Sequence, residues 1–234
     1  FVMGGLSLLG VVPVLHMHAR QVEKKEGSLE LYLPEMFRQS RKMGKLMVPT
    51  LITSSGAGLI MPFMNVFFRQ VHYQSDETIG VVFAFGSLAM CVGMMVAPLL
   101  VDRFGKVEFY ALSRGLSLPF LALLGTAPWF GVAALAYNMR IMLMNMAGPV
   151  YQNFVMESVE PKLRPAASSM LTVSASLGWG ISSVISGWLQ VNYGFGPAFV
   201  GAGIGYALGA FSAWWFFIRK PGVCKPRHVP AIGD

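Results

Sequence analysis

The chain has 234 residues, of which 54% are hydrophobic and only 12% are charged. A soluble domain carries about 25% charged residues, so this composition excludes an ordinary soluble globular protein. The net charge of +7 alone could indicate nucleic-acid binding, but the basic residues stand in short clusters between long apolar runs. Such clusters are typical of the loops of a polytopic membrane protein, and we expect no nucleic-acid partner.

Residues 1–15 form a short apolar run (FVMGGLSLLGVVPVL). A helix that spans the hydrocarbon core needs about 20 apolar residues, so this run is too short. It has no basic leader and no obvious cleavage site, which argues against a secretory signal peptide. We interpret it as the end of a truncated transmembrane helix, and the sequence as part of a longer chain.

Residues 16–45 are the most charged segment, with seven Lys/Arg and four Glu, and are predicted to form a cytoplasmic linker. Four apolar residues in it could line one face of a helix on the membrane surface: Leu29, Leu33, Met36 and Phe37. Pro34 weakens that helix unless the helix starts there. A surface helix and a flexible linker both fit the sequence.

Residues 46–218 are predicted to form a bundle of six membrane-spanning helices, followed by a basic cytoplasmic tail at 219–234. The expected spans are 46–68, 79–101, 109–126, 129–156, 167–189 and 197–218. Serine and glycine are frequent in the fifth span, and the sixth has Gly201, Gly205 and Gly209 at four-residue spacing. Such small residues predict close contact between helices.

The third and fourth spans depend on one ambiguous region. Residues 115–139 carry no charge and could form one helix, but Gly125 and Pro128 favour a break into two. With two helices nearly all Lys and Arg residues outside the spans fall on one side, whereas a single helix scatters them over both. Because basic loops concentrate in the cytoplasm, we predict two helices and a cytoplasmic C-terminus.

The loop between the second and third spans contains a recognisable motif, within APLLVDRFGKVEFY. It resembles the signature G-x-x-x-D-R-x-G-[RK]-[RK] of the major facilitator superfamily. Four residues match that signature: Asp102, Arg103, Gly105 and Lys106. Pro98 replaces the leading glycine and Val107 the second basic residue, as in the degenerate copy that the C-terminal half of this family usually carries. The segment VEPKLRPAASS also resembles the matching loop of bacterial members.

This resemblance covers nearly the whole chain and implies an all-α polytopic membrane bundle, the C-terminal six-helix half of a transporter. It implies a substrate path between two six-helix bundles that opens alternately to each side of the membrane. The implied partners are the lipid bilayer, a small-molecule substrate and the N-terminal half, which is missing from this sequence. We expect a monomer in the bacterial plasma (inner) membrane.

The motif suits a cytoplasmic gate. Asp102 ends one helix and can accept hydrogen bonds from Arg103 or from a neighbouring helix N-terminus. Gly105 permits a tight reversal into the next helix. Charge pairs that form in one conformation and break in the other bias a two-state equilibrium. The simpler alternative is that Arg103 and Lys106 only anchor the loop in the cytoplasm.

Arg140 lies near the middle of the fourth span, too deep to reach the interface easily. A cation there costs at least ~2.5 kcal/mol, so it normally faces a partner or a water-filled cavity. Asn138, Asn145 and Gln152 recur every seven residues on the same helix and form a polar stripe. Arg140 is rotated from this stripe by roughly 160–200°. We therefore predict that either Arg140 or the stripe lines the substrate path, but not both.

Two further features of the spans are weaker candidates. Asn65, near the outer end of the first span, is a candidate for the substrate path. Four methionines could form an adaptable apolar pocket, or simply pack in the core: Met139, Met142, Met144 and Met146.

We predict a secondary active transporter that moves a small solute by alternating access. No nucleotide-binding loop, nucleophile–base pair or metal-ligand spacing occurs, so we expect no enzyme activity, cofactor or metal. Efflux of amphipathic compounds fits the many aromatic and methionine residues, whereas uptake of an anionic metabolite fits Arg140. The alternative is a non-transporting membrane sensor or scaffold that kept the fold.

Overall fold

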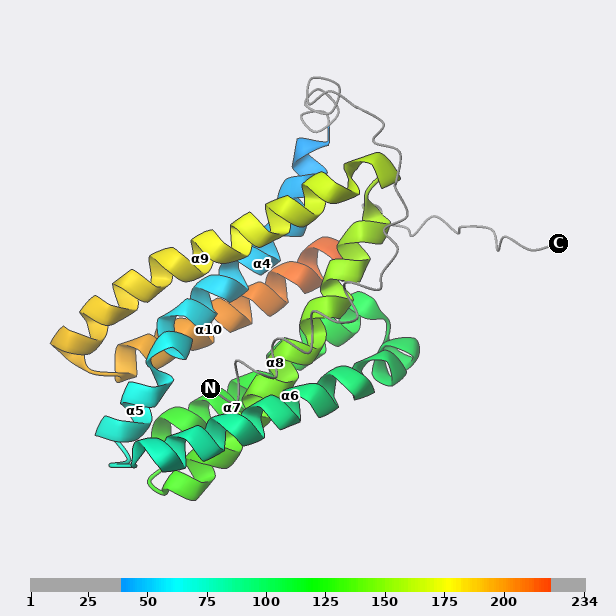
Figure 1. Ribbon diagram of the computed structural model, residues 1–234. Helices are drawn as coiled ribbons and strands as arrows, with labels where there is room; N and C mark the ends of the chain where they lie inside the picture. Colours follow the sequence, from blue (N-terminus) through cyan, green and yellow to red (C-terminus); the bar gives the residue numbers. More distant parts are fainter. Residues whose placement is uncertain (1–38, 220–234) are drawn as a thin grey trace, which may run out of the picture. The chain divides into compact units, whose positions relative to one another are not determined.

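The computed structural model describes residues 39–219, which form helices joined by short loops and contain no strand (Figure 1). In chain order the elements are α4 (Ser40–Ile60), η1 (Met61–Phe63), α5 (Met64–Gln70), α6 (Asp76–Phe104), α7 (Lys106–Thr126), α8 (Phe130–Ser158), η2 (Pro161–Leu163), α9 (Arg164–Tyr193), α10 (Gly196–Ala213) and η3 (Trp214–Ile218). The truncated helix, the surface helix and nearly all of the basic tail that the sequence predicts lie outside the described residues.

Two helix boundaries bear on the sequence predictions. The predicted break near Gly125 and Pro128 is confirmed, because α7 ends at Thr126 and α8 begins at Phe130. The first long helix begins at Ser40 rather than at residue 46, so the end of the predicted linker is helical.

Five helical stretches among the described residues are long and apolar enough to cross a membrane. The helix α8 is as long as α6, at 29 residues, but is not one of the five. Four polar side chains lower its hydropathy: Asn138, Arg140, Asn145 and Gln152. Because polar groups are expensive in lipid, α8 is the helix that most needs cover from its neighbours, and α6 and α7 both pack against it.

The helices pack as two groups of three (Figure 1). The helix α4 lies between α9 and α10, α8 lies between α6 and α7, and α7 also packs against α10. A Cβ atom added at Gly205 of α10 would lie 3.0 Å from the Cα atom of Gly56 of α4. Gly201 and Gly209 face Leu59 and Thr53 of the same helix. The predicted role of the α10 glycines in close packing is therefore confirmed.

Aromatic side chains surround the loop that joins α5 to α6. His72 in this loop packs against the rings of Phe67 and Phe130, at centroid distances of 5.4 and 6.0 Å. Its Nε2 atom is buried and has no hydrogen-bond partner among the described residues. Burial lowers the pKa of His72, because the charged imidazolium would lose its hydration there.

We expect this histidine to make the protein less stable in acid. The pKa of His72 is lower in the folded than in the unfolded chain, so the unfolded chain binds more protons below about pH 6.5. The free energy of unfolding therefore falls as the pH drops from there to the pKa of the folded state. Thermal unfolding of the purified protein at about pH 7.5 and about pH 5.5 measures the loss. The His72→Phe variant keeps the aromatic packing and should lose less; an equal loss would assign the effect to other groups.

Candidate functional site

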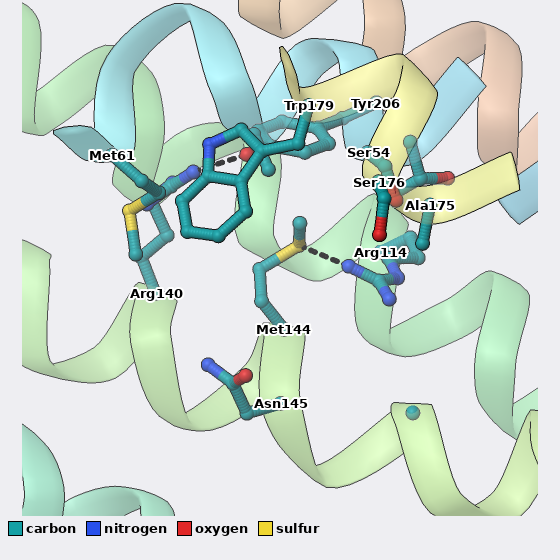
Figure 2. A pocket seen from close by; sticks show the side chains of 13 residues that line it. Ser54, Met61, Arg114, Arg140, Met144, Asn145, Ala175, Ser176, Trp179 and Tyr206 are labelled. Atoms are coloured by element: carbon teal, nitrogen blue, oxygen red, sulfur yellow. Dashed lines mark hydrogen bonds between the residues drawn. The ribbon is translucent and has the colours of Figure 1, made fainter. Parts of the chain in front are cut away.

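A cavity of ≈350 Å³ lies where α4, α8 and α9 face one another, with further lining from η1, α7 and α10 (Figure 2). Its polar lining is Thr53, Ser54, Arg114, Arg140, Asn145, Ser176 and Tyr206, and its apolar lining includes Met61, Met144 and Trp179. A mainly apolar cavity with a few converging polar groups has the character of a small-molecule site.

Arg140 forms part of the cavity wall and is itself only 1% exposed. Its Nη2 atom donates to the hydroxyl of Tyr206 on α10, and its Nη1 atom donates to the sulfur of Met61 at 3.2 Å. The guanidinium carbon lies 5.1 Å from the centre of the Tyr206 ring. Its Nε atom is buried and has no partner among the described residues. Within residues 39–219, Arg140 is therefore held by weak acceptors and not by a carboxylate.

A second arginine, Arg114, enters the same cavity from α7. Its Nη1 atom donates to the sulfur of Met144 at 3.1 Å, and its guanidinium carbon lies 5.0 Å from the centre of the Tyr110 ring. Its Nε atom, too, is buried without a partner in the described part of the chain. Arg114 is not among the substrate-path residues predicted from the sequence. The helix α7 begins at Lys106 and not at the predicted residue 109, so Arg114 lies in its third turn.

The predicted polar stripe of α8 divides between two environments. Asn145 lines the main cavity, and Gln152 lines an adjoining cavity of ≈360 Å³ that shares Asn145 and Arg114. Asn138 instead faces α6, where a Cβ atom at Gly86 would lie 3.1 Å from its Oδ1 atom. The prediction that Arg140 and the stripe exclude each other from the cavity is therefore wrong for Asn145.

The remaining candidate, Asn65, is not brought to the cavity. It lies exposed on α5, and its Oδ1 atom accepts a hydrogen bond from the backbone N–H of Val66 at 2.8 Å. It is absent from the lining of the main and the adjoining cavities.

The loop that carries the predicted gate motif is as short as expected. Gly105 alone separates α6 from α7 and has a φ of +89°, which L-residues with a Cβ atom rarely adopt. The Nζ atom of Lys106 donates to both carboxylate oxygens of Glu157, at the end of α8, at 2.5 and 2.6 Å. Glu157 is a partner that the sequence analysis did not predict.

The expected bond between Asp102 and Arg103 is not formed. The guanidinium carbon of Arg103 lies 6.0 Å from the centre of the Phe104 ring, and the exposed carboxylate of Asp102 has no hydrogen bond or ion pair within the described residues. Neighbouring residues on a helix point in different directions, so Arg103 cannot easily reach the carboxylate that precedes it.

Comparison with known families gives one match. The sequence model of the Major Facilitator Superfamily matches residues 1–231, which include the motif loop and every residue of the cavity wall. A comparison with curated proteins returned no match. No group of three or more His, Cys, Asp or Glu side chains within residues 39–219 could hold a metal ion.

Proposed function

The chain belongs to the major facilitator superfamily, and from that premise we propose that it forms the C-terminal six-helix half of a secondary transporter that works by alternating access. The observation that carries this proposal is the cavity itself. It gathers Arg114, Arg140 and Asn145 inside a bundle whose helices are mostly apolar enough to cross a membrane. Charged side chains inside a membrane-spanning bundle usually belong to a substrate path.

The cavity lining supports two classes of solute. Met61, Met144 and Trp179, which is 48% exposed, offer apolar surface that suits amphipathic compounds and hence efflux. Arg114 and Arg140 favour a solute that carries negative charge.

The proposal also includes a cytoplasmic gate, a membrane location and an orientation in that membrane. The pair of Lys106 and Glu157 joins the ends of α7 and α8 and is the described charge pair best suited to open and close the cytoplasmic side. We also propose a monomer in the bacterial inner membrane with an N-terminal half opposite the cavity. The positive loops favour a cytoplasmic position for the basic tail.

Alternating access is tested by thiol labelling at Asn145, which lies in the cavity wall and is partly exposed. In the full-length protein, with Cys91 and Cys224 replaced, Asn145→Cys should react with a membrane-impermeant thiol reagent added to either side of sealed vesicles. Ala136→Cys, fully buried on the same helix, is the matched control and should stay unlabelled. Labelling of position 145 from one side only would contradict transport and support a sensor or scaffold that keeps the fold.

A further inference from the structure

The cavity holds two positive charges that no described acidic residue neutralises. The acidic residues between residues 39 and 219 are Asp76, Glu77, Asp102, Glu108, Glu157 and Glu160. None of them lines the main or the adjoining cavity; they lie in the loops or in the terminal turns of the helices. Two unneutralised guanidinium groups in a membrane bundle are costly, and an anion that enters the cavity removes part of that cost.

The present partners of both guanidinium groups are easily displaced. Arg114 and Arg140 each donate to a methionine sulfur, Met144 and Met61 respectively. A thioether is a weak acceptor on a flexible side chain, whereas a carboxylate accepts two parallel bonds from a guanidinium group. Because Arg140 is only 1% exposed, Met61 must swing away before a ligand reaches it.

The two arginines define separate subsites. Arg114 packs on Tyr110 of its own helix, and Arg140 packs on Tyr206 of α10. In Figure 2 the side chain of Met144 lies between them. One small acid group would therefore leave one charge unneutralised, whereas two acid groups joined by an apolar chain across Met144 would neutralise both.

We propose that the solute is a small dicarboxylate, with one carboxylate bound to Arg114 in place of the Met144 sulfur and the other bound to Arg140 in place of the Met61 sulfur. The inference rests on the proposed transport function and adds the substrate class to it. Asn145, Ser54 and Ser176 also line the cavity and can donate further hydrogen bonds. A cavity of ≈350 Å³ accommodates a short chain of this kind.

The test compares molecules of equal shape and different charge. Binding of straight-chain dicarboxylates, from butanedioate to octanedioate, is measured by titration calorimetry on the full-length protein at neutral pH, next to their monoamides and diamides. The best diacid should bind about 30-fold or more tightly than its monoamide, because the monoamide leaves one arginine unpaired. The diamide should not bind measurably.

Variants assign each charge to its subsite. Arg114→Gln should weaken the diacid to the affinity of the monoamide, while Arg69→Gln, an exposed arginine outside the cavity, should change nothing. Arg140→Gln should weaken binding of the diacid as well. If that variant folds poorly, Arg140→Lys keeps a positive charge at the site and should weaken binding of the diacid less. Elution of each variant as a single species in size-exclusion chromatography shows that it is folded.

Three results would overturn the inference: a monoamide that binds as tightly as its diacid, a phosphate monoester that binds more tightly than any diacid, or no binding of any anion. If position 145 is still labelled from both sides, the transport proposal stands and only the substrate class is wrong. If labelling and binding both fail, the transport proposal is wrong as well.

Discussion

Replacement of Arg140 by methionine should reduce transport to a small residual rate and leave the protein at least as stable as the unchanged chain. Arg140 is 1% exposed and is held by Tyr206 and the sulfur of Met61 rather than by a carboxylate. A buried charge carries a desolvation cost that a packed apolar side chain avoids, and replacing even a buried ion pair by apolar residues is often neutral or stabilising, by about 1–4 kcal/mol. Loss of a charged contact to substrate costs about 2–5 kcal/mol, which is on the order of a 100-fold fall in transport.

The two readouts separate a functional arginine from a structural one. Transport is followed as solute flux into vesicles, and stability as the melting temperature of the purified protein. A structural tie predicts the opposite pattern, in which Arg140→Met melts well below the unchanged protein. Tyr206→Phe is the matched control, because it removes only the hydroxyl acceptor and should reduce transport far less than the loss of the charge.

The membrane class and the break between α7 and α8 could be predicted because they depend on local properties of the sequence. The length of an apolar run decides whether it can cross the bilayer, and the charges beside it decide its orientation. The break between α7 and α8 lies at Pro128, close to Gly125, where two poor helix formers stand near each other. Single prolines such as Pro119 and Pro149 remain inside their helices. The glycines of α10 likewise predict a close contact between helices, although the sequence does not identify α4 as the partner helix.

Arg114 was missed because its environment depends on where α7 begins. The predicted helix started near residue 109, which left Arg114 close to the membrane surface. In the structure Gly105 is the whole loop, so α7 starts at Lys106 and carries Arg114 about 12 Å along its axis. The glycine in the motif was a usable signal, since a single residue with positive φ is enough to reverse the chain.

The arrangement of the α8 side chains could not be deduced from helical rotation alone. Rotation places Arg140 and Asn145 on different faces, but it ignores the length of the arginine side chain, which reaches Tyr206 on α10 and Met61 beyond α4. It also gives no information about which helix covers each face. Asn138 meets α6, and Asn145 meets the cavity, because tertiary packing divides one stripe between two neighbours.

The contact between α4 and α9 gives the second large effect that we expect. A Cβ atom at Gly178 of α9 would lie 2.7 Å from the carbonyl oxygen of Leu51, and one at Gly58 of α4 would lie 2.5 Å from the carbonyl oxygen of Trp179. Both obstacles are backbone atoms, so no side-chain rotation can relieve them. The two helices therefore touch through glycines on both sides.

Gly178→Ala should destabilise the protein even though alanine is the better helix former. Overpacking costs about 1–3 kcal/mol, and it can exceed the roughly 1 kcal/mol that alanine contributes to helix formation, because here the whole helix has to move. Gly180→Ala is a matched control two positions along the same helix, where a Cβ atom would meet nothing within 4 Å. That variant should melt at the original temperature or slightly above it.

The displacement should also reach the cavity, because α9 supplies Ser176 and Trp179 to its wall. We therefore expect Gly178→Ala to lower both the melting temperature and the transport rate, whereas Gly180→Ala lowers neither. Equal melting temperatures for the two variants would mean that α4 and α9 separate readily, and that their contact is not what fixes the shape of the cavity. A fall in transport without a fall in melting temperature would mean that α9 itself moves during transport and needs glycine at position 178 to slide past α4.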